Sequence, residues 1–141
     1  SYKIKDQFQN PRKIYCIDNG IFNFIGLKFS KDYGKMYENT VFLKLKRESF
    51  DNHLINIFYW KNIQHEEVDF VIKEGLRVRQ LIQVCYDIEN PETRKREVRS
   101  LLKASKELKC DNLIVITKGY ENNEHIDGKN IGFIPLWKWL L

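Results

Sequence analysis

The 141-residue chain has few cysteines, few prolines and no long apolar run, and each shortage excludes a class of protein. Its three cysteines, Cys16, Cys85 and Cys110, are odd in number and form no CxxC motif. A disulfide framework is therefore not expected, and a reducing, cytoplasmic compartment fits best. The three histidines have no zinc-ligand spacing with the cysteines. No apolar run approaches the roughly 20 residues of a transmembrane helix, so we expect no membrane insertion.

The composition is that of one globular domain. Hydrophobic residues make up 43% and charged residues 30% of the chain, a balance that disordered chains lack. We see no internal repeat and no linker, so we expect a single domain over residues 1–141. The net charge of +5 permits contact with nucleic acid, although an ordinary solvated surface has the same charge.

Apolar periodicity and turn signals predict the order of the secondary-structure elements. In chain order they are short strands at 2–9 and 13–18, one or two helical turns at 21–27, a helix at 33–48, strands at 54–60, 67–73 and 76–86, a helix from Asn90 to Lys109, a strand at 112–117, a polar loop at 119–130, and a last strand with an aromatic tail at 131–141.

Local signals join these elements into an α/β fold. Gly75 lies between two strand-like runs and predicts a hairpin. Asn90 and Pro91 are typical of a helix start. The helix that they begin lies between the strands 76–86 and 112–117, which predicts a crossover and parallel pairing of the two strands. We therefore expect a mixed central sheet flanked by helices.

Two acidic residues lie where the pattern predicts burial. Glu38 shares a helical stripe with Val41, Phe42 and Leu45, and Asp69 interrupts the apolar strand 67–73. A buried carboxylate is unfavourable unless it has a partner, a metal ion or a raised pKa. The alternative is that Glu38 pairs locally and remains half-solvated, and that Asp69 occupies an edge position.

Gln83 and Cys85 stand two residues apart on the next strand and point to the same face. An acid on one strand, followed by two functional side chains at this spacing, is the geometry of a metal site with two carboxylates and a lysine. The alternative is that Gln83 is a satisfied core amide and Cys85 a small buried apolar residue.

This order of residues resembles the PD-(D/E)XK, or restriction-endonuclease-like, superfamily. Several stretches are similar to the C-terminal nuclease-like domain of archaeal-type AAA ATPases, and together they span nearly the whole chain. They are Pro11-Arg-Lys-Ile-Tyr-Cys-Ile-Asp-Asn-Gly20, Tyr37-Glu-Asn-Thr-Val-Phe-Leu43, Tyr59-Trp60, Glu67-Val-Asp-Phe-Val-Ile72, Gln83-Val-Cys-Tyr-Asp87, Thr93 with Arg96-Glu97, and Asn112-Leu-Ile-Val-Ile-Thr117.

The resemblance implies a catalytic set of Glu38, Asp69, Gln83 and Cys85. Glu38, Asp69 and Gln83 would hold Mg²⁺ or Mn²⁺, with Gln83 in place of the second acid, which lowers the expected affinity. Cys85 stands in the position of the lysine and cannot supply an ammonium group.

A lysine from elsewhere could replace it. Lys61 and Lys73 are near in sequence, but the sequence places neither. Arg94 falls on the inner side of its helix, where it either brings positive charge to the site or snorkels to solvent. As a nucleic-acid contact set we predict Lys61, Arg94, Arg96 and Arg99, the alternative being a solvated helix face.

The functional hypothesis is a catalytically degenerate nuclease domain that binds DNA or regulates an ATPase. The resemblance implies that an ATPase core of the same protein is its partner, and that ATP acts only through that core, since this chain has no GxxxxGK[ST] motif. Two alternatives remain open: an active Mg²⁺-dependent endonuclease, and a protein-interaction module. In a protein-interaction module, Phe133, Trp137 and Trp139 would form the contact surface, although packing in the core is the other explanation for these residues.

Overall fold

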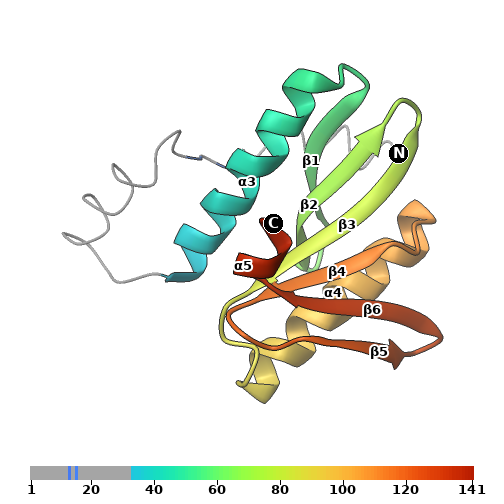
Figure 1. The fold of residues 1–141 in the computed structure, drawn as a ribbon. Coiled ribbons are helices and arrows are strands. Elements are labelled where there is room, and N and C mark those ends of the chain that lie inside the picture. Colours follow the sequence, from blue (N-terminus) through green and yellow to red (C-terminus); the bar gives the residue numbers. More distant parts are fainter. Residues whose placement is uncertain (1–12, 14, 16–32) are drawn as a thin grey trace.

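The computed structural model describes residues 13, 15 and 33–141 (Figure 1). Apart from Lys13 and Tyr15, the elements expected at 2–9, 13–18 and 21–27 lie outside the described residues. The described chain contains α3 (Tyr33–Asp51), β1 (Ile55–Lys61), β2 (Glu67–Glu74), β3 (Arg77–Cys85), α4 (Pro91–Leu108), β4 (Leu113–Thr117), β5 (Asn122–Ile126), β6 (Lys129–Pro135) and α5 (Leu136–Trp139). Within residues 33–141 the predicted order is confirmed, with one exception at β5.

The six strands form one mixed sheet in the order β1-β2-β3-β4-β6-β5. Strands β1, β2 and β3 are antiparallel neighbours, and Gly75, at φ +63°, makes the turn between β2 and β3. Strand β4 lies parallel to both β3 and β6, which confirms the crossover through α4. The fold class is therefore a mixed α/β sheet flanked by helices, as predicted.

The prediction of a loop at 119–130 is wrong, because this stretch contains strand β5. This strand pairs antiparallel with β6 at the edge of the sheet, around a turn in which Asp127 and Gly128 have positive φ. Its sequence, Asn-Asn-Glu-His-Ile, has no buried residue. An edge strand without a buried face leaves no apolar alternation in the sequence, so the pattern could not reveal it.

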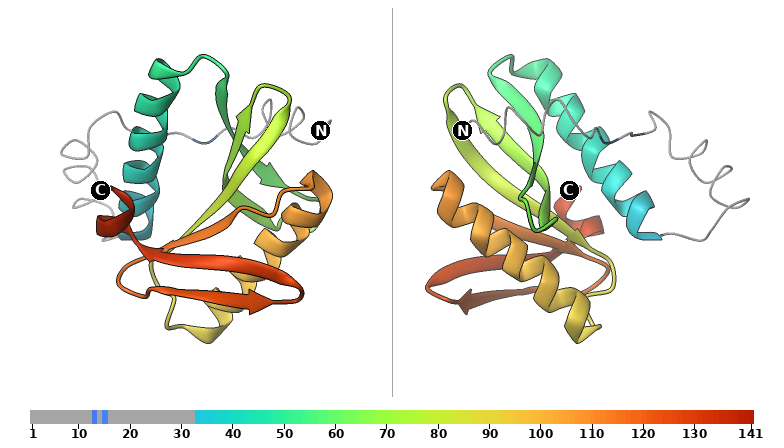
Figure 2. Two further views of the ribbon diagram at one scale, coloured as in Figure 1. Left: turned by 45° about the vertical axis from the view of Figure 1, so that its right-hand side comes forward. Right: turned by 180° about the vertical axis from the view of Figure 1, so that it is seen from behind.

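Each face of the sheet is covered by a helix, as the two views of Figure 2 show. On one face Val41 and Leu45 of α3 pack with Phe70, Ile72 and Ile116. The other face carries α4, whose buried residues Val98, Leu101 and Ala104 pack with Val68, Leu81 and Val115. Helix α5 lies on the α3 face, where Leu136 joins the same cluster.

Helix α4 begins as its sequence predicts. The side chain of Asn90 accepts hydrogen bonds from the amides of Glu92 and Thr93, at 3.0 and 3.1 Å, and Pro91 occupies the first turn. The helix ends at Leu108 and is capped by Lys109, which has a left-handed φ of +55°. No helix in residues 33–141 is long and apolar enough to span a membrane.

A bulge in β2 sets the position of Asp69. Val68 pairs with Trp60 and Val71 with Phe58, so three steps along β2 face two steps along β1. The extra residue falls at Asp69 or Phe70. The ladder between β2 and β3 extends from the turn only to Phe70 and Ile82. Beyond this point β2 and β3 are joined by side chains, and the candidate site lies there.

Candidate functional site

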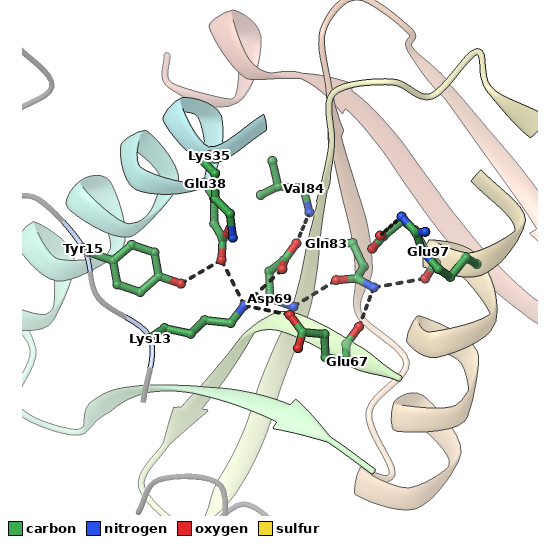
Figure 3. A network of polar contacts seen from close by, with 10 residues as sticks. Lys13, Tyr15, Lys35, Glu38, Glu67, Asp69, Gln83, Val84 and Glu97 are labelled. Atoms are coloured by element: carbon green, nitrogen blue, oxygen red, sulfur yellow. Dashed lines mark hydrogen bonds and ion pairs between the residues drawn. The ribbon is translucent and has the colours of Figure 1, made fainter. Parts of the chain in front are cut away.

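An ammonium group lies among three carboxylates at this point of the sheet (Figure 3). The Nζ atom of Lys13 is 2.9 Å from Oε1 of Glu38, 3.2 Å from Oδ1 of Asp69 and 3.4 Å from Oε1 of Glu67. Burial lowers the pKa of Lys13, but the three carboxylates outweigh burial and hold it above its usual value. The lysine therefore remains charged throughout the physiological range.

Glu38 reaches the cluster from the first half of α3. Its side chain is 12% exposed, and its Oε1 also accepts a hydrogen bond from the hydroxyl of Tyr15 at 3.0 Å. The ring of Tyr15 stacks on Phe42 of the same helix, with centroids 4.2 Å apart. Burial and the nearby Glu38 raise the pKa of Tyr15 above its usual value, so Tyr15 acts as a neutral donor. Local pairing also occurs, because Nζ of Lys35 lies 3.9 Å from Oε2 of Glu38, but Glu38 is largely buried rather than half-solvated and its closer partners are far away in sequence.

Asp69 joins β2 to β3 through its carboxylate. Its Oδ2 accepts a hydrogen bond from the amide of Val84 at 2.8 Å, and its Oδ1 contacts Lys13. Burial raises the pKa of Asp69 to about 6, and Glu38 adds to the rise, while Lys13 and the Val84 amide oppose it. The carboxylate is therefore less stable in its charged form than an exposed aspartate, even beside the lysine.

Gln83 is fully buried, and its amide group holds three backbone groups together. Its Oε1 accepts from the amide of Asp69 at 2.9 Å, and its Nε2 donates to the carbonyls of Glu67 at 2.9 Å and Glu97 at 3.1 Å. These bonds replace the missing ladder between β2 and β3 and connect both strands to α4. Gln83 therefore has the geometry of the satisfied core amide that the sequence left open as the alternative.

Cys85 is 2% exposed and belongs to the apolar cluster beneath α4. Burial, followed by the charge of Glu97, raises the pKa of its thiol to about 12. Gln83 and Cys85 do share one face of β3, as predicted from their spacing, but Cys85 offers no charge there. The ammonium group comes from Lys13 instead.

The cluster opens into a polar cavity of about 490 Å³ between the first turns of α3 and α4 and the end of β3. Glu38, Glu67 and Asp69 line it, together with Arg96 and Glu97 of α4. Burial raises the pKa of Glu97 to about 7, with Asp69 adding to the rise and Arg96 opposing it. The cavity is thus acidic, and two of its carboxyl groups take up protons near neutral pH.

The predicted metal set does not fit a divalent cation in this arrangement. Glu38 and Asp69 do converge on one point, but the ammonium of Lys13 occupies it. The oxygen of Gln83 already accepts from a backbone amide. Within the described part of the chain, no group of three or more His, Cys, Asp or Glu is arranged to hold a metal ion.

Of the predicted nucleic-acid residues, Lys61 lies on β1 and the other three lie on α4, where Arg94 and Arg99 line one cavity and Arg96 lines the acidic one. Arg94 lies away from the cluster, where its guanidinium group pairs with Glu124 at 2.5 Å and lies over the ring of Phe133 at 4.8 Å. Arg96 lines the acidic cavity beside Glu97, at 3.5 Å, and Arg99 pairs with Glu66 at 3.0 Å.

The two lysines considered as replacements for the missing one lie at opposite ends of the β1–β2 pair. Lys61 is at the end of β1, opposite Glu67. Lys73 is near the β2–β3 turn, at the far end of β2 from Asp69.

The C-terminal aromatic residues divide between core and surface. Phe133 is buried beneath α4, and Trp139 packs against α3 with the ammonium of Lys44 4.1 Å from its ring. Trp137 is 63% exposed. A contact surface built on all three is therefore not present, and the interaction hypothesis rests on Trp137 alone.

Four residues of the site were not predicted from the sequence: Lys13, Tyr15 and Glu67 of the cluster, and Glu97 of the cavity. All four belong to stretches on which the resemblance rests. The polar residues of the Pro11–Gly20 stretch could have drawn attention to Lys13. Its contacts with Glu38 and Asp69, 25 and 56 residues away, cannot be assigned from sequence spacing.

Residues 33–139 match the family described as "Domain of unknown function (DUF4143)". The whole chain also aligns, at 43% identity over 147 residues, with the uncharacterized protein MJ1544 of Methanocaldococcus jannaschii. The chain spans 31% of the length of that relative. No solved structure matches.

Proposed function

The chain belongs to the DUF4143 family, and we propose that it is a PD-(D/E)XK-type nuclease domain that binds DNA without cleaving it, as part of a AAA-type ATPase. One observation carries the proposal. The cation between Glu38 and Asp69 is the ammonium of Lys13, at 2.9 and 3.2 Å.

A lysine in this place neutralises the acids without a metal ion. A divalent cation would have to displace a buried ammonium that has three carboxylate partners. The neutral Gln83 offers it no compensating charge, because Mg²⁺ in proteins is bound chiefly through carboxylates. Glu38 and Asp69 therefore stabilise the fold, and DNA binding is expected to need no metal ion.

Binding to DNA is supported by the charge of the chain and of α4. The net charge is +5. Lys95, Arg96, Arg99, Lys103 and Lys106 are exposed along the solvent side of α4. Phosphate contacts from such residues release counterions, so the affinity should fall steeply as salt rises. The ATPase context rests on the resemblance, and the relative, of which this chain spans 31%, has room for a further domain of that kind.

The test is a titration of labelled duplex DNA, followed by fluorescence anisotropy, in EDTA and in Mg²⁺ at several salt concentrations. We expect the same affinity in both buffers and a strong decrease with salt. Supercoiled plasmid incubated with Mg²⁺ or Mn²⁺ should remain intact. Nicking by the wild type that is lost in Asp69→Asn would overturn the proposal.

A metal-dependent endonuclease is the second candidate, and the same lysine favours it. Lys13 brings an ammonium group to Asp69, which the sequence of β3 alone does not provide. In that case Lys13→Met should abolish nicking while duplex binding persists. If the first proposal holds, neither the wild type nor Lys13→Met cleaves.

A further inference from the structure

A second cavity, of about 610 Å³, lies between α3 and strands β1 and β2. It shares Asp69 with the acidic cavity, so the two are neighbours. Its volume is within the range of about 300–1,000 Å³ that is typical of ligand sites. Its walls are mainly aromatic and come from the segment before α3, from α3 and from both strands. The aromatic residues are Tyr15, Phe42, Phe50, Phe58, Tyr59 and Phe70.

Positive charge lies at the rim of this aromatic groove. Lys46 and Arg47 of α3 both line it and are exposed. Neither pairs with an acidic residue among those that the structure describes. The Nζ atom of Lys46 lies 5.7 Å from the ring centroid of Phe50, which is itself 70% exposed. An exposed phenylalanine beside two exposed cations is suited to a flat, anionic ligand.

Among the described residues, one that lines the groove, Tyr59, also has a buried polar atom without a partner. The hydroxyl of Tyr59 is buried and makes no hydrogen bond, and among the described side chains no other buried nitrogen or oxygen is in this state. Lys13 lies over the ring of Tyr59 at 5.2 Å, so the aromatic groove and the carboxylate cluster meet at this residue. A buried hydroxyl without a partner is unfavourable, and a ligand with polar edges would satisfy it.

We propose that this groove binds unpaired bases of single-stranded nucleic acid, which deepens the proposed function and rests on it. Aromatic side chains stack on bases of any sequence, and cations beside them contact the phosphates. Tyr59 would then bond to the edge of a base. A lipid chain or an apolar peptide would satisfy neither the two cations nor the hydroxyl. Bases in a duplex are already stacked and cannot enter.

The experiment compares a labelled oligothymidylate of about 12 nucleotides, within the footprint of known single-strand binders, with a duplex of equal length. Wild-type protein should bind the single strand more tightly. Phe50→Ala should weaken that binding about fivefold or more, because one stacked base is lost. Tyr59→Phe should weaken it about two- to tenfold, because one hydrogen bond is lost. Duplex binding should not change in either variant.

Matched controls come from other surfaces. Leu76→Ala truncates an apolar residue that is 98% exposed at the β2–β3 turn, and Lys95→Ala removes a cation from α4. Leu76→Ala should leave single-strand binding unchanged, and Lys95→Ala should weaken single strand and duplex alike. Circular dichroism confirms that each variant is folded.

The outcomes separate this inference from the proposed function. Two results would refute base binding in the groove and leave the DNA-binding proposal standing. One is duplex binding with no preference for the single strand. The other is equal single-strand binding by the wild type and the two groove variants. Loss of all nucleic-acid binding at low salt overturns both. Competition by an acidic peptide that is lost with Phe50→Ala would assign the groove to a protein partner and refute the nucleic-acid reading.

Discussion

Replacing Gln83 with glutamate restores an acid to the nuclease motif. The variant tests whether the side chain at this position binds a metal ion or stabilises the fold. In the structure Nε2 of Gln83 donates to two carbonyls, those of Glu67 and Glu97. Gln83→Glu puts an oxygen against both carbonyls in a fully buried place. An ionised carboxylate there has no donor except the amide of Asp69, so the new side chain will remain protonated at neutral pH.

The magnitude follows from the bonds. The protonated acid can donate to one carbonyl and leaves the other unsatisfied, which costs about 1–3 kcal/mol of unfolding free energy. The pKa of this acid is raised in the folded state above its unfolded value of about 4.3. Stability is therefore fully present below that value and decreases as the pH rises, by up to about 1.4 kcal/mol per pH unit until the folded pKa is reached.

Urea unfolding of wild type and Gln83→Glu at pH 5, 6, 7 and 8, followed by tryptophan fluorescence, measures the difference at each pH. Gln83→Met is the matched control, because it removes the same bonds without adding a titrating group. Its destabilisation should be constant over the range. A Gln83→Glu variant that is as stable as the wild type at pH 8, and that is stabilised by Mg²⁺, would refute the structural role of the amide.

The remaining predictions concern the charges and the thiol. Lys13→Met should destabilise the domain by about 3 kcal/mol at pH 8, because it leaves two poorly solvated carboxylates without their cation. The loss should be much smaller at pH 5, where Asp69 is protonated. Equal losses of unfolding free energy in urea at both pH values would contradict this prediction. In the wild type Asp69 and Glu97 have folded pKa values of about 6 and about 7, above their ordinary values, so the free energy of unfolding should fall as pH rises from about 4 to 7. Glu97→Gln should remove the upper part of this fall, roughly 3 kcal/mol, and an unchanged pH profile would argue against a buried Glu97. Cys85 should react with a thiol reagent at pH 8 only when urea unfolds the domain, in a Cys16→Ser background, because burial and a pKa of about 12 suppress its thiolate.

Much of the fold could be predicted because its signals are local. Asn90 and Pro91 set the start of α4, and the buried strand at 113–117 follows that helix at a crossover distance. The edge strand β5 could not be predicted, since nothing covers its faces. The bulge at Asp69 was also hidden, because an acid within an apolar run does not by itself indicate a change of strand register.

The candidate site was predictable only in part, for a related reason. Glu38 and Asp69 stood out because each interrupts an apolar pattern, and the structure brings both to one cluster. Lys13 gave no such signal, because a lysine in a polar segment breaks no pattern. Gln83 was recognised as unusual but assigned to a metal, although its bonds to Glu67 and Glu97 depend on the packing of α4 against β2.

The arrangement gives the largely buried carboxylates of Glu38 and Asp69 a cation although β3 carries no lysine. The contacts of Glu38, Asp69 and Gln83 connect α3, β2, β3, α4 and the segment that holds Lys13. A lysine at position 85 would bury its stem among the apolar residues beneath α4, whereas Lys13 reaches the acids from the α3 side with 20% of its side chain exposed. The three carboxylates of Glu38, Glu67 and Asp69 outnumber the ammonium groups of Lys13 and Lys35, so the cluster keeps an excess of negative charge and repels phosphate. Single strands should therefore enter at the cationic rim of the aromatic groove, and the carboxylate cluster should influence this binding only by holding α3, Lys13 and Tyr15 in place.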